Sequence, residues 1–248
     1  MHVAICQPHY LPWLGYFEMI DRVDCFVFLD HVDFCKRGWQ NRNRIRKDGD
    51  ADGPKWLSVP IEKASQRRSA PASIAEAQLD ARDWRGAQLS SIRQVYRRAP
   101  NFERVFPIVE ELLADAPATL GALNRKVVLG INALLGIETP CISSSSLAVS
   151  GTKTELLSSV LRCVGATRYL ANNGSSVYLE GSVFDDQGVD WAYQDYAHPV
   201  YAQRFGGKAL PWLSHLSIVD ALMNVEGDLL GLIRSGRPAH TQENRYAG

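Results

Sequence analysis

Short apolar runs separated by polar turns dominate the first thirty residues. Residues 3–6 are apolar and stop at Gln7, which predicts a buried strand that ends in a loop. A short helix is expected over 15–21, and a second buried strand over 25–29. Strand, helix and strand within so few residues favour a βαβ unit with parallel strands and a right-handed crossover.

Helical periodicity dominates the middle of the chain. Apolar positions spaced three and four residues apart predict three helices, over 83–98, 102–116 and 119–135. Thr119 is a suitable N-cap and Gly136 a suitable C-cap for the third of them. A strand is expected over 56–61, a loop over 47–55, and a mobile, Ser/Ala/Arg-rich connection over 63–78.

The second half of the chain repeats the alternation of strands and helices. The pattern predicts strands at 140–143, 168–170 and 189–193, helices at about 154–164, 218–223 and 228–233, and a polar tail. The fold class expected from this order is α/β, a three-layer sandwich with a mainly parallel, Rossmann-like sheet. We expect one domain over 1–248 with a helical insertion at about 80–136.

Polar side chains follow the first two predicted strands. Gln7, His9 and Tyr10 follow the first strand, and Asp30 follows the second. Ligands of parallel α/β sheets bind outside the carboxyl ends of the strands, so these groups are expected to share one rim. Two prolines stiffen the first loop, and rigidly held polar groups suit a reactive site. The alternative is that Tyr10 and its apolar neighbours only plug the edge of the sheet.

The opening loop resembles the WbqC-like family through Gln7-Pro-His-Tyr-Leu-Pro-Trp-Leu-Gly-Tyr-Phe17. The resemblance covers essentially the whole chain. It continues through Asp24-Cys-Phe-Val-Phe-Leu-Asp30, Trp39-Gln-Asn-Arg-Asn-Arg44, Gly151-Thr-Lys-Thr-Glu155, Tyr178-Leu179, His198-Pro-Val-Tyr201 and Leu216-Ser-Ile-Val-Asp220. It implies a link to surface-polysaccharide biosynthesis and, for some members, transfer of glycine or another amino acid to an amino sugar.

A more distant resemblance concerns the strand, the Pro- and His-containing loop, the helix and the strand that ends in Asp30. This order is similar to the nucleotidyltransferase and pantothenate-synthetase superfamily. The resemblance implies that His9 contacts ATP phosphates at a helix N-terminus, where amide dipoles favour anions. The second histidine of that superfamily's motif is absent around residues 15–17, which puts adenylyl transfer in doubt.

A basic stretch over 36–47 contains Asn41 and Arg42 beside an aromatic residue, Trp39. Arginine forks bind phosphate through two parallel hydrogen bonds, so Asn41 and Arg42 are candidates for an anion clamp. A solvated strand or loop is the plainer interpretation. A nucleic-acid face is a third option, which the balance of 27 basic and 27 acidic residues disfavours.

Further candidates lie later in the chain. Thr152 and Lys153 stand between a predicted strand and a helix, where they form either an anion site or a simple capped helix start. The spacing is not that of a P-loop. Ser144 would bind substrate hydroxyls or satisfy its own loop, and His198 is either a general base or a structural residue.

The composition bears on the cellular compartment of the protein. An odd number of cysteines, five, without a C-x-x-C pair favours a reducing compartment. The sequence has no apolar run of the ~18 residues that a membrane span needs, and its start is unlike a signal peptide. We therefore expect a cytoplasmic protein without membrane insertion, whose oligomeric state the sequence leaves open.

The leading hypothesis is a transferase that adds an activated aminoacyl or other acyl group to the amine of an amino sugar or small molecule. His9 and Lys153 would contact phosphate, and Arg42 would clamp a second anionic group. Asp30 would act as a base or position the amine. The partners expected are small molecules, a nucleotide-sugar or an activated acyl donor. The alternatives are a ligase-like enzyme that uses ATP and Mg²⁺, with Asp30 as a metal ligand, and a non-catalytic nucleotide- or RNA-binding protein.

Overall fold

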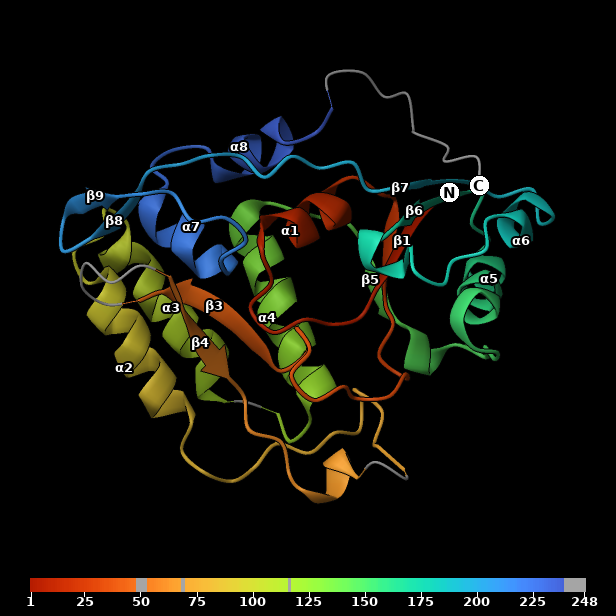
Figure 1. Ribbon diagram of the computed structural model, residues 1–248, viewed down its shortest axis with the longest axis horizontal. Helices are drawn as coiled ribbons and strands as arrows, with labels where there is room; N and C mark the ends of the chain where they lie inside the picture. Colours follow the sequence, from red (N-terminus) through yellow and green to blue (C-terminus); the bar gives the residue numbers. More distant parts are fainter. Residues whose placement is uncertain (48–52, 68–69, 116, 239–248) are drawn as a thin grey trace.

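The computed structural model describes residues 1–47, 53–67, 70–115 and 117–238 (Figure 1). Most of the loop expected over 47–55, residue 116 of the second expected helix and the polar tail from 239 lie outside the described residues.

A five-stranded parallel sheet forms the centre of the fold. Its strand order is β5-β2-β1-β6-β7, and every pairing within it is parallel. The strands are β1 (His2–Cys6), β2 (Cys25–Phe28), β5 (Cys141–Ser143), β6 (Arg168–Ala171) and β7 (Asp190–Tyr193). The expected α/β class with a mainly parallel sheet is thereby confirmed, including the parallel pairing of the first two strands.

Residues of the central strands alternate between two apolar layers, one on each face of the sheet. Ala4 and Phe26 belong to the larger core, which includes apolar residues of α1 (Leu14–Asp21) and α4 (Leu120–Leu135). Val3 and Val27 belong to the smaller core, with residues of α5 (Lys153–Cys163) and α6 (Ser182–Asp185). Burial on both faces explains the unbroken apolar runs of β1 and β2. In Figure 1 the sheet stands between α1 and α4 on one side and α5 and α6 on the other.

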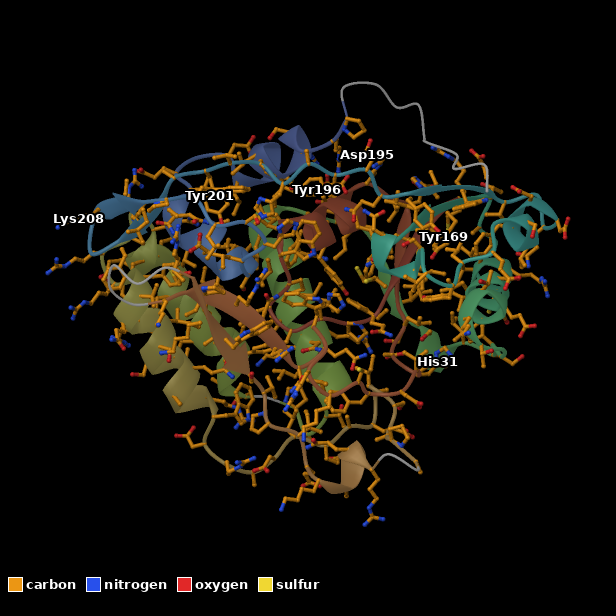
Figure 2. All side chains as sticks on the ribbon, in the orientation of Figure 1. His31, Tyr169, Asp195, Tyr196, Tyr201 and Lys208 are labelled. Carbon is orange, nitrogen blue, oxygen red and sulfur yellow. The ribbon has the colours of Figure 1, made fainter. Side chains whose placement is uncertain are left out.

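The remaining elements extend the larger core away from the sheet. The helices are α2 (Arg85–Tyr96), α3 (Phe102–Ala114), α7 (Ile218–Asn224) and α8 (Leu229–Ser235). Two antiparallel hairpins are formed by β3 (Arg42–Arg46) with β4 (Pro54–Ser58), and by β8 (Gln203–Phe205) with β9 (Lys208–Leu210). From β7 the chain runs past α1 to the β8–β9 hairpin. Tyr196, Tyr201 and Lys208, labelled in Figure 2, mark this path.

The expected helix caps are confirmed for α4. The Thr119 side chain accepts a hydrogen bond from the backbone N–H of Ala122, and Gly136 ends the helix in the left-handed conformation, with φ of 74°. Glycine adopts this conformation at little cost, because it has no Cβ atom.

Two expectations about the segments after β2 need correction. The strand expected over 56–61 is present but spans Pro54–Ser58. It pairs with β3, a strand that was not expected because its sequence is basic. The connection expected to be mobile packs against the core in its described part, where Ile74 and Ala77 are fully buried. The backbone N–H of Ile74 also donates to the carbonyl of Val32. Two apolar residues among many small polar ones were enough to anchor the segment.

Within the described residues, no helix combines the length and the apolar character that crossing a bilayer requires.

Candidate functional site

A cavity of about 420 Å³ opens at the carboxyl ends of β1, β6 and β7. The chain runs from β1 through β2 to β5 on one side, and then places β6 and β7 on the other side of β1. The strand order therefore reverses between β1 and β6, and ligands of open α/β sheets bind at such a switch point. The volume also lies within the range of about 300–1,000 Å³ that is typical of small-molecule sites.

The lining of this cavity combines apolar side chains with uncharged polar groups. Its side chains that donate or accept hydrogen bonds include those of Gln7, His9, Tyr16, Tyr169, Asn172, Asn173, Ser175, Tyr178 and Gln194. The aromatic rings of Trp13 and Trp39 and aliphatic residues such as Met19 and Leu157 also line it. No Asp, Glu, Lys or Arg side chain is among the described residues that line it. Burial of an anion without a counter-charge is costly, so the interior suits an uncharged polar ligand.

Hydrogen bonds from two other segments hold the opening loop in place. The backbone N–H of Tyr10 donates to the carbonyl of Trp39, at 3.0 Å. The buried amide of Asn124 donates to the carbonyls of Pro8 and Gln40, at 2.9 and 2.7 Å. The loop that carries His9 is thus fixed both to α4 and to the segment before β3. These bonds hold it in place, as its two prolines suggested.

The orientation of the Gln7 amide follows from a chain of bonds. The backbone N–H of Cys35 donates to Gln40 Oε1 at 2.7 Å, so Gln40 presents its Nε2 group on the other side. That group donates to Gln7 Oε1 at 2.8 Å. Within the described residues, Gln7 Nε2 has no acceptor. Gln7 therefore offers the cavity a hydrogen-bond donor.

His9 is a neutral imidazole in this cavity. Burial lowers the pKa of His9 from 6.5 to about 4, because the charged form loses its hydration. Its ring centroid lies 5.2 Å from that of Tyr16, whose hydroxyl donates to the carbonyl of Gln7. At neutral pH the imidazole is unprotonated and has a nitrogen lone pair that can accept a proton.

The loop after β6 supplies the opposite wall. Asn172 donates to Cys6 Sγ and accepts from the backbone N–H of Gly174, so both ends of its amide are engaged. Asn173 donates to the carbonyl of Gln194 at 2.8 Å, which leaves its Oδ1 atom as an acceptor in the lining. Burial raises the pKa of the Cys6 thiol to about 12, so Cys6 is not a thiolate nucleophile at neutral pH.

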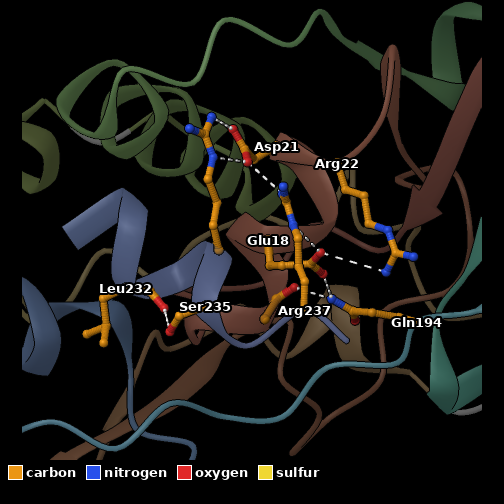
Figure 3. Close-up of polar contacts among 9 residues, drawn as sticks. Glu18, Asp21, Arg22, Gln194, Leu232, Ser235 and Arg237 are labelled. Atoms are coloured by element: carbon orange, nitrogen blue, oxygen red, sulfur yellow. Dashed lines mark hydrogen bonds and ion pairs between the residues drawn. The ribbon is translucent and has the colours of Figure 1, made fainter. Parts of the chain in front are cut away.

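Gln194 connects the cavity to an ion cluster around the buried Glu18 (Figure 3). Its Nε2 group donates to the carbonyl of Gly15 and to Glu18 Oε2, at 2.7 and 2.5 Å. Glu18 is fully buried and also pairs with Arg237, whose Nε lies 3.0 Å from Oε1. Arg237 reaches Asp21 as well, at 2.6 Å. The acidic and basic side chains of this cluster pair with one another instead of facing the cavity. The Oε1 atom of Gln194 remains available as an acceptor.

Asp30 and Ser144 lie together, but neither belongs to the cavity lining. The buried carboxylate of Asp30 accepts from Ser144 Oγ at 3.1 Å, and from the backbone N–H and hydroxyl of Ser145 at 2.9 and 3.0 Å. Asp30 therefore closes the turn after β5. Both carboxylate oxygens accept hydrogen bonds from this turn, which gives Asp30 a structural role in it. Among the described residues there is no group of three His, Cys, Asp or Glu side chains able to hold a metal.

The other candidates are spread around the cavity. Tyr10 is fully buried and donates to Gln88 at 2.6 Å. Asn41 donates to the carbonyl of Val59, and Arg42 lies on the outer surface of β3. None of these three candidates lines the cavity.

Thr152 and Lys153 are exposed at the start of α5, and the Thr152 side chain makes no capping bond. His198 stacks on Trp13, with ring centroids 5.7 Å apart, but does not itself line the cavity. Burial is the main reason that the pKa of His198 is lowered. The structure thus brings Gln7 and His9 together, and leaves the functional roles of the others as predictions.

Comparison with known proteins identifies the family to which the chain belongs. The sequence profile of the WbqC-like protein family matches residues 7–230. The chain belongs to this family. A relative is the uncharacterized protein Rv1507c of Mycobacterium tuberculosis (strain ATCC 25618 / H37Rv), which is 30% identical over 234 residues, or 94% of this chain and 97% of the relative. No solved structure matches the chain.

Sequence reasoning missed part of the site of this WbqC-like protein. Asn172 and Asn173 follow β6, and Gln194 follows β7, in the same relation that Gln7 has to β1. The signal was therefore present, since both strands were expected and polar residues come directly after them. Gln40 was also missed, because its role is to orient Gln7 rather than to reach the cavity.

Proposed function

We propose that this WbqC-like protein is a transferase that acylates the amine of an amino sugar or a similar hydroxyl-rich small molecule. The single observation that carries the proposal is the uncharged polar cavity at the switch point, with a neutral imidazole in its wall. Hydroxyl groups both donate and accept hydrogen bonds, and the lining offers both a donor on Gln7 and acceptors on Asn173 and Gln194.

Two residues have a role in the proposed reaction. The neutral amine attacks the acyl carbon, a C–N bond forms, and the bond from that carbon to the leaving group breaks. His9 accepts the proton that the nitrogen loses and passes it to the leaving group. The Gln7 Nε2 group donates to the acyl oxygen while negative charge develops on it. The nature of the acyl group, glycyl or related, comes from the family resemblance of the sequence.

One feature disfavours the ligase alternative. The described lining holds no cation that would bind the phosphates of ATP inside the cavity. A pre-activated acyl donor does not require such a cation.

The test is a product assay. The purified protein is incubated with glucosamine or galactosamine and the glycyl thioester of N-acetylcysteamine, or with glycine and ATP. Mass spectrometry then detects a glycyl amide of the sugar. We expect the product from the thioester. His9→Gln should lower the rate at least 100-fold, because it removes the proton acceptor. His31→Gln removes an imidazole outside the cavity and serves as the matched control.

Product formation only with glycine and ATP, with release of pyrophosphate, would instead establish the ligase. Unchanged turnover in His9→Gln would remove His9 from the mechanism.

A further inference from the structure

A second polar surface lies at the mouth of the cavity, outside the residues that the proposed reaction uses. We call it the Trp–Arg surface, and it consists of Trp39, Trp56, Arg42 and Arg44. Trp39 belongs both to this surface and to the cavity lining. The two indole centroids lie 5.5 Å apart. The rings are unusually exposed for tryptophan, 43% for Trp39 and 42% for Trp56.

The β3–β4 hairpin determines which residues reach this surface. Arg44 lies directly opposite Trp56 in the antiparallel register, and Arg42 comes two residues earlier on the same face. The residues between them face the other way, and Ile45 and Leu57 are buried in the core. Alternation along the hairpin therefore separates a cationic, aromatic outer face from an apolar inner face.

The two guanidinium groups lie over the indole rings. Arg42 Cζ is 4.1 Å from the ring centroid of Trp56, and Arg44 Cζ is 5.4 Å from that of Trp39. Such contacts hold an arginine in place without neutralising its charge. Arg44 also donates to the carbonyl of His215 at 3.1 Å, which anchors it further.

Neither arginine has an anionic partner in the part of the chain that the structure describes. None of the ion pairs there involves Arg42 or Arg44. The Nε atom of each is buried and has no hydrogen-bond acceptor. Charge-assisted hydrogen bonds to an anion are therefore open to the terminal N–H groups of both guanidinium groups, while the buried Nε atoms stay enclosed.

We propose that the Trp–Arg surface binds the nucleoside diphosphate of a nucleotide-linked amino sugar whose sugar ring occupies the cavity. This inference rests on the proposed function. A planar base stacks on an exposed indole, and arginine forks suit the oxygens of a diphosphate. The cavity interior has no charged lining, so the anionic part of such a ligand belongs outside it. Trp39, shared by both regions, places the two parts of one ligand side by side.

Proteins that bind single-stranded nucleic acid use the same combination of aromatic rings and cationic side chains. The small ligand is favoured because the Trp–Arg surface contributes two guanidinium groups beside the mouth of a cavity of small-molecule size, and because the formal net charge of the chain is zero. A protein that tracks a nucleic-acid backbone needs a longer positive groove.

Isothermal titration calorimetry with uridine diphosphate, adenosine diphosphate and inorganic pyrophosphate tests the proposal. We expect a nucleoside diphosphate to bind at least tenfold more tightly than pyrophosphate, which has no ring to stack. Trp39→Ala and Arg42→Gln should each raise the Kd at least tenfold. Arg42→Lys keeps the charge but loses the planar fork, and should recover only part of the affinity.

Lys36→Gln is the control, because Lys36 is an exposed cation of the same segment that lies outside the surface. It should change the Kd less than twofold. Trp39→Phe retains an aromatic ring, and it replaces Trp39→Ala if the melting temperature shows that the alanine variant does not fold. A structural role alone would alter melting temperatures and leave the Kd of folded variants unchanged, and that result would overturn the proposal.

Two other results would also overturn it. One is equal binding of pyrophosphate and nucleotides. The other is an oligonucleotide that binds more than tenfold tighter than any mononucleotide, with an affinity that falls steeply with salt. Binding needs no turnover, so the two proposals fail separately. Nucleotide affinity without acylation would remove the proposed function, whereas acylation of a free amino sugar without nucleotide affinity would remove only the role of this surface.

Discussion

The burial of His9 makes the stability of the protein depend on pH in a way that one substitution should abolish. In the unfolded chain the imidazole binds a proton near pH 6.5, but burial lowers the pKa of His9 in the folded protein to about 4. Between these values the unfolded state binds more protons than the folded state. The free energy of unfolding therefore falls as the pH decreases from 6.5 toward 4. From pH 7.5 to pH 5, linkage through His9 alone amounts to about 2 kcal/mol.

His9→Gln and His9→Phe remove this titration in two different ways. Glutamine keeps hydrogen-bonding groups, whereas phenylalanine keeps an aromatic ring against Tyr16, 5.2 Å away between centroids. Urea unfolding at pH 7.5 and pH 5 gives the free energy for each protein. The drop between the two pH values should be about 2 kcal/mol smaller in both variants than in the unsubstituted protein. An equal drop in all three would show that folding does not lower the pKa of His9, and the argument from its burial would fail.

Three further substitutions, and a fourth as a control, test the scaffold by urea unfolding at neutral pH. Thr119→Ala should cost about 1 kcal/mol, because it removes the N-cap acceptor of α4, and no loss would contradict the cap. Gly121→Ala should destabilise by about 1–3 kcal/mol, since its Cβ atom would lie 2.8 Å from the Ala75 Cα atom. Gly130→Ala meets only a leucine side chain and should cost less, so an equal loss in both would refute the backbone contact. Asp220→Ala should cost about 3 kcal/mol, because it leaves two buried tyrosine hydroxyls without their acceptor, and a loss below 1 kcal/mol would show that they find another.

Local features of the fold were predictable from the sequence because local chemistry decides them. The apolar runs of β1 and β2, the periodicity of α4 and its caps at Thr119 and Gly136 each depend on a few neighbouring residues. The strand β3 was not predictable in the same way. Asn43, Ile45 and Arg46 are buried, and arginines at positions 42, 44 and 46 hide this pattern in a stretch that reads as simply basic.

The location of the site depends on long-range pairing. Gln7 and Asp30 both follow strands, and the sequence gives no reason to separate them. The structure places β6 on the side of β1 opposite to β2, so the switch point lies beside Gln7 and away from Asp30. Asn172 reaches the cavity for the same reason. Which edge of β1 receives β6 is decided by packing across the whole sheet, and no pattern within either strand encodes it.

The separation of charge between the cavity and its mouth is what connects the two proposals. The buried Glu18 pairs with the half-buried Arg237 behind Gln194, so the two charges neutralise each other instead of facing the cavity. In the part of the chain that the structure describes, the cavity lining is uncharged, and Arg42 and Arg44 on the hairpin outside have no anionic partner. A wholly neutral ligand would gain nothing from those arginines, and a ligand anionic throughout would be costly to bury in the interior. A molecule with a neutral, hydroxyl-rich end and an anionic, ring-bearing end satisfies both regions at once.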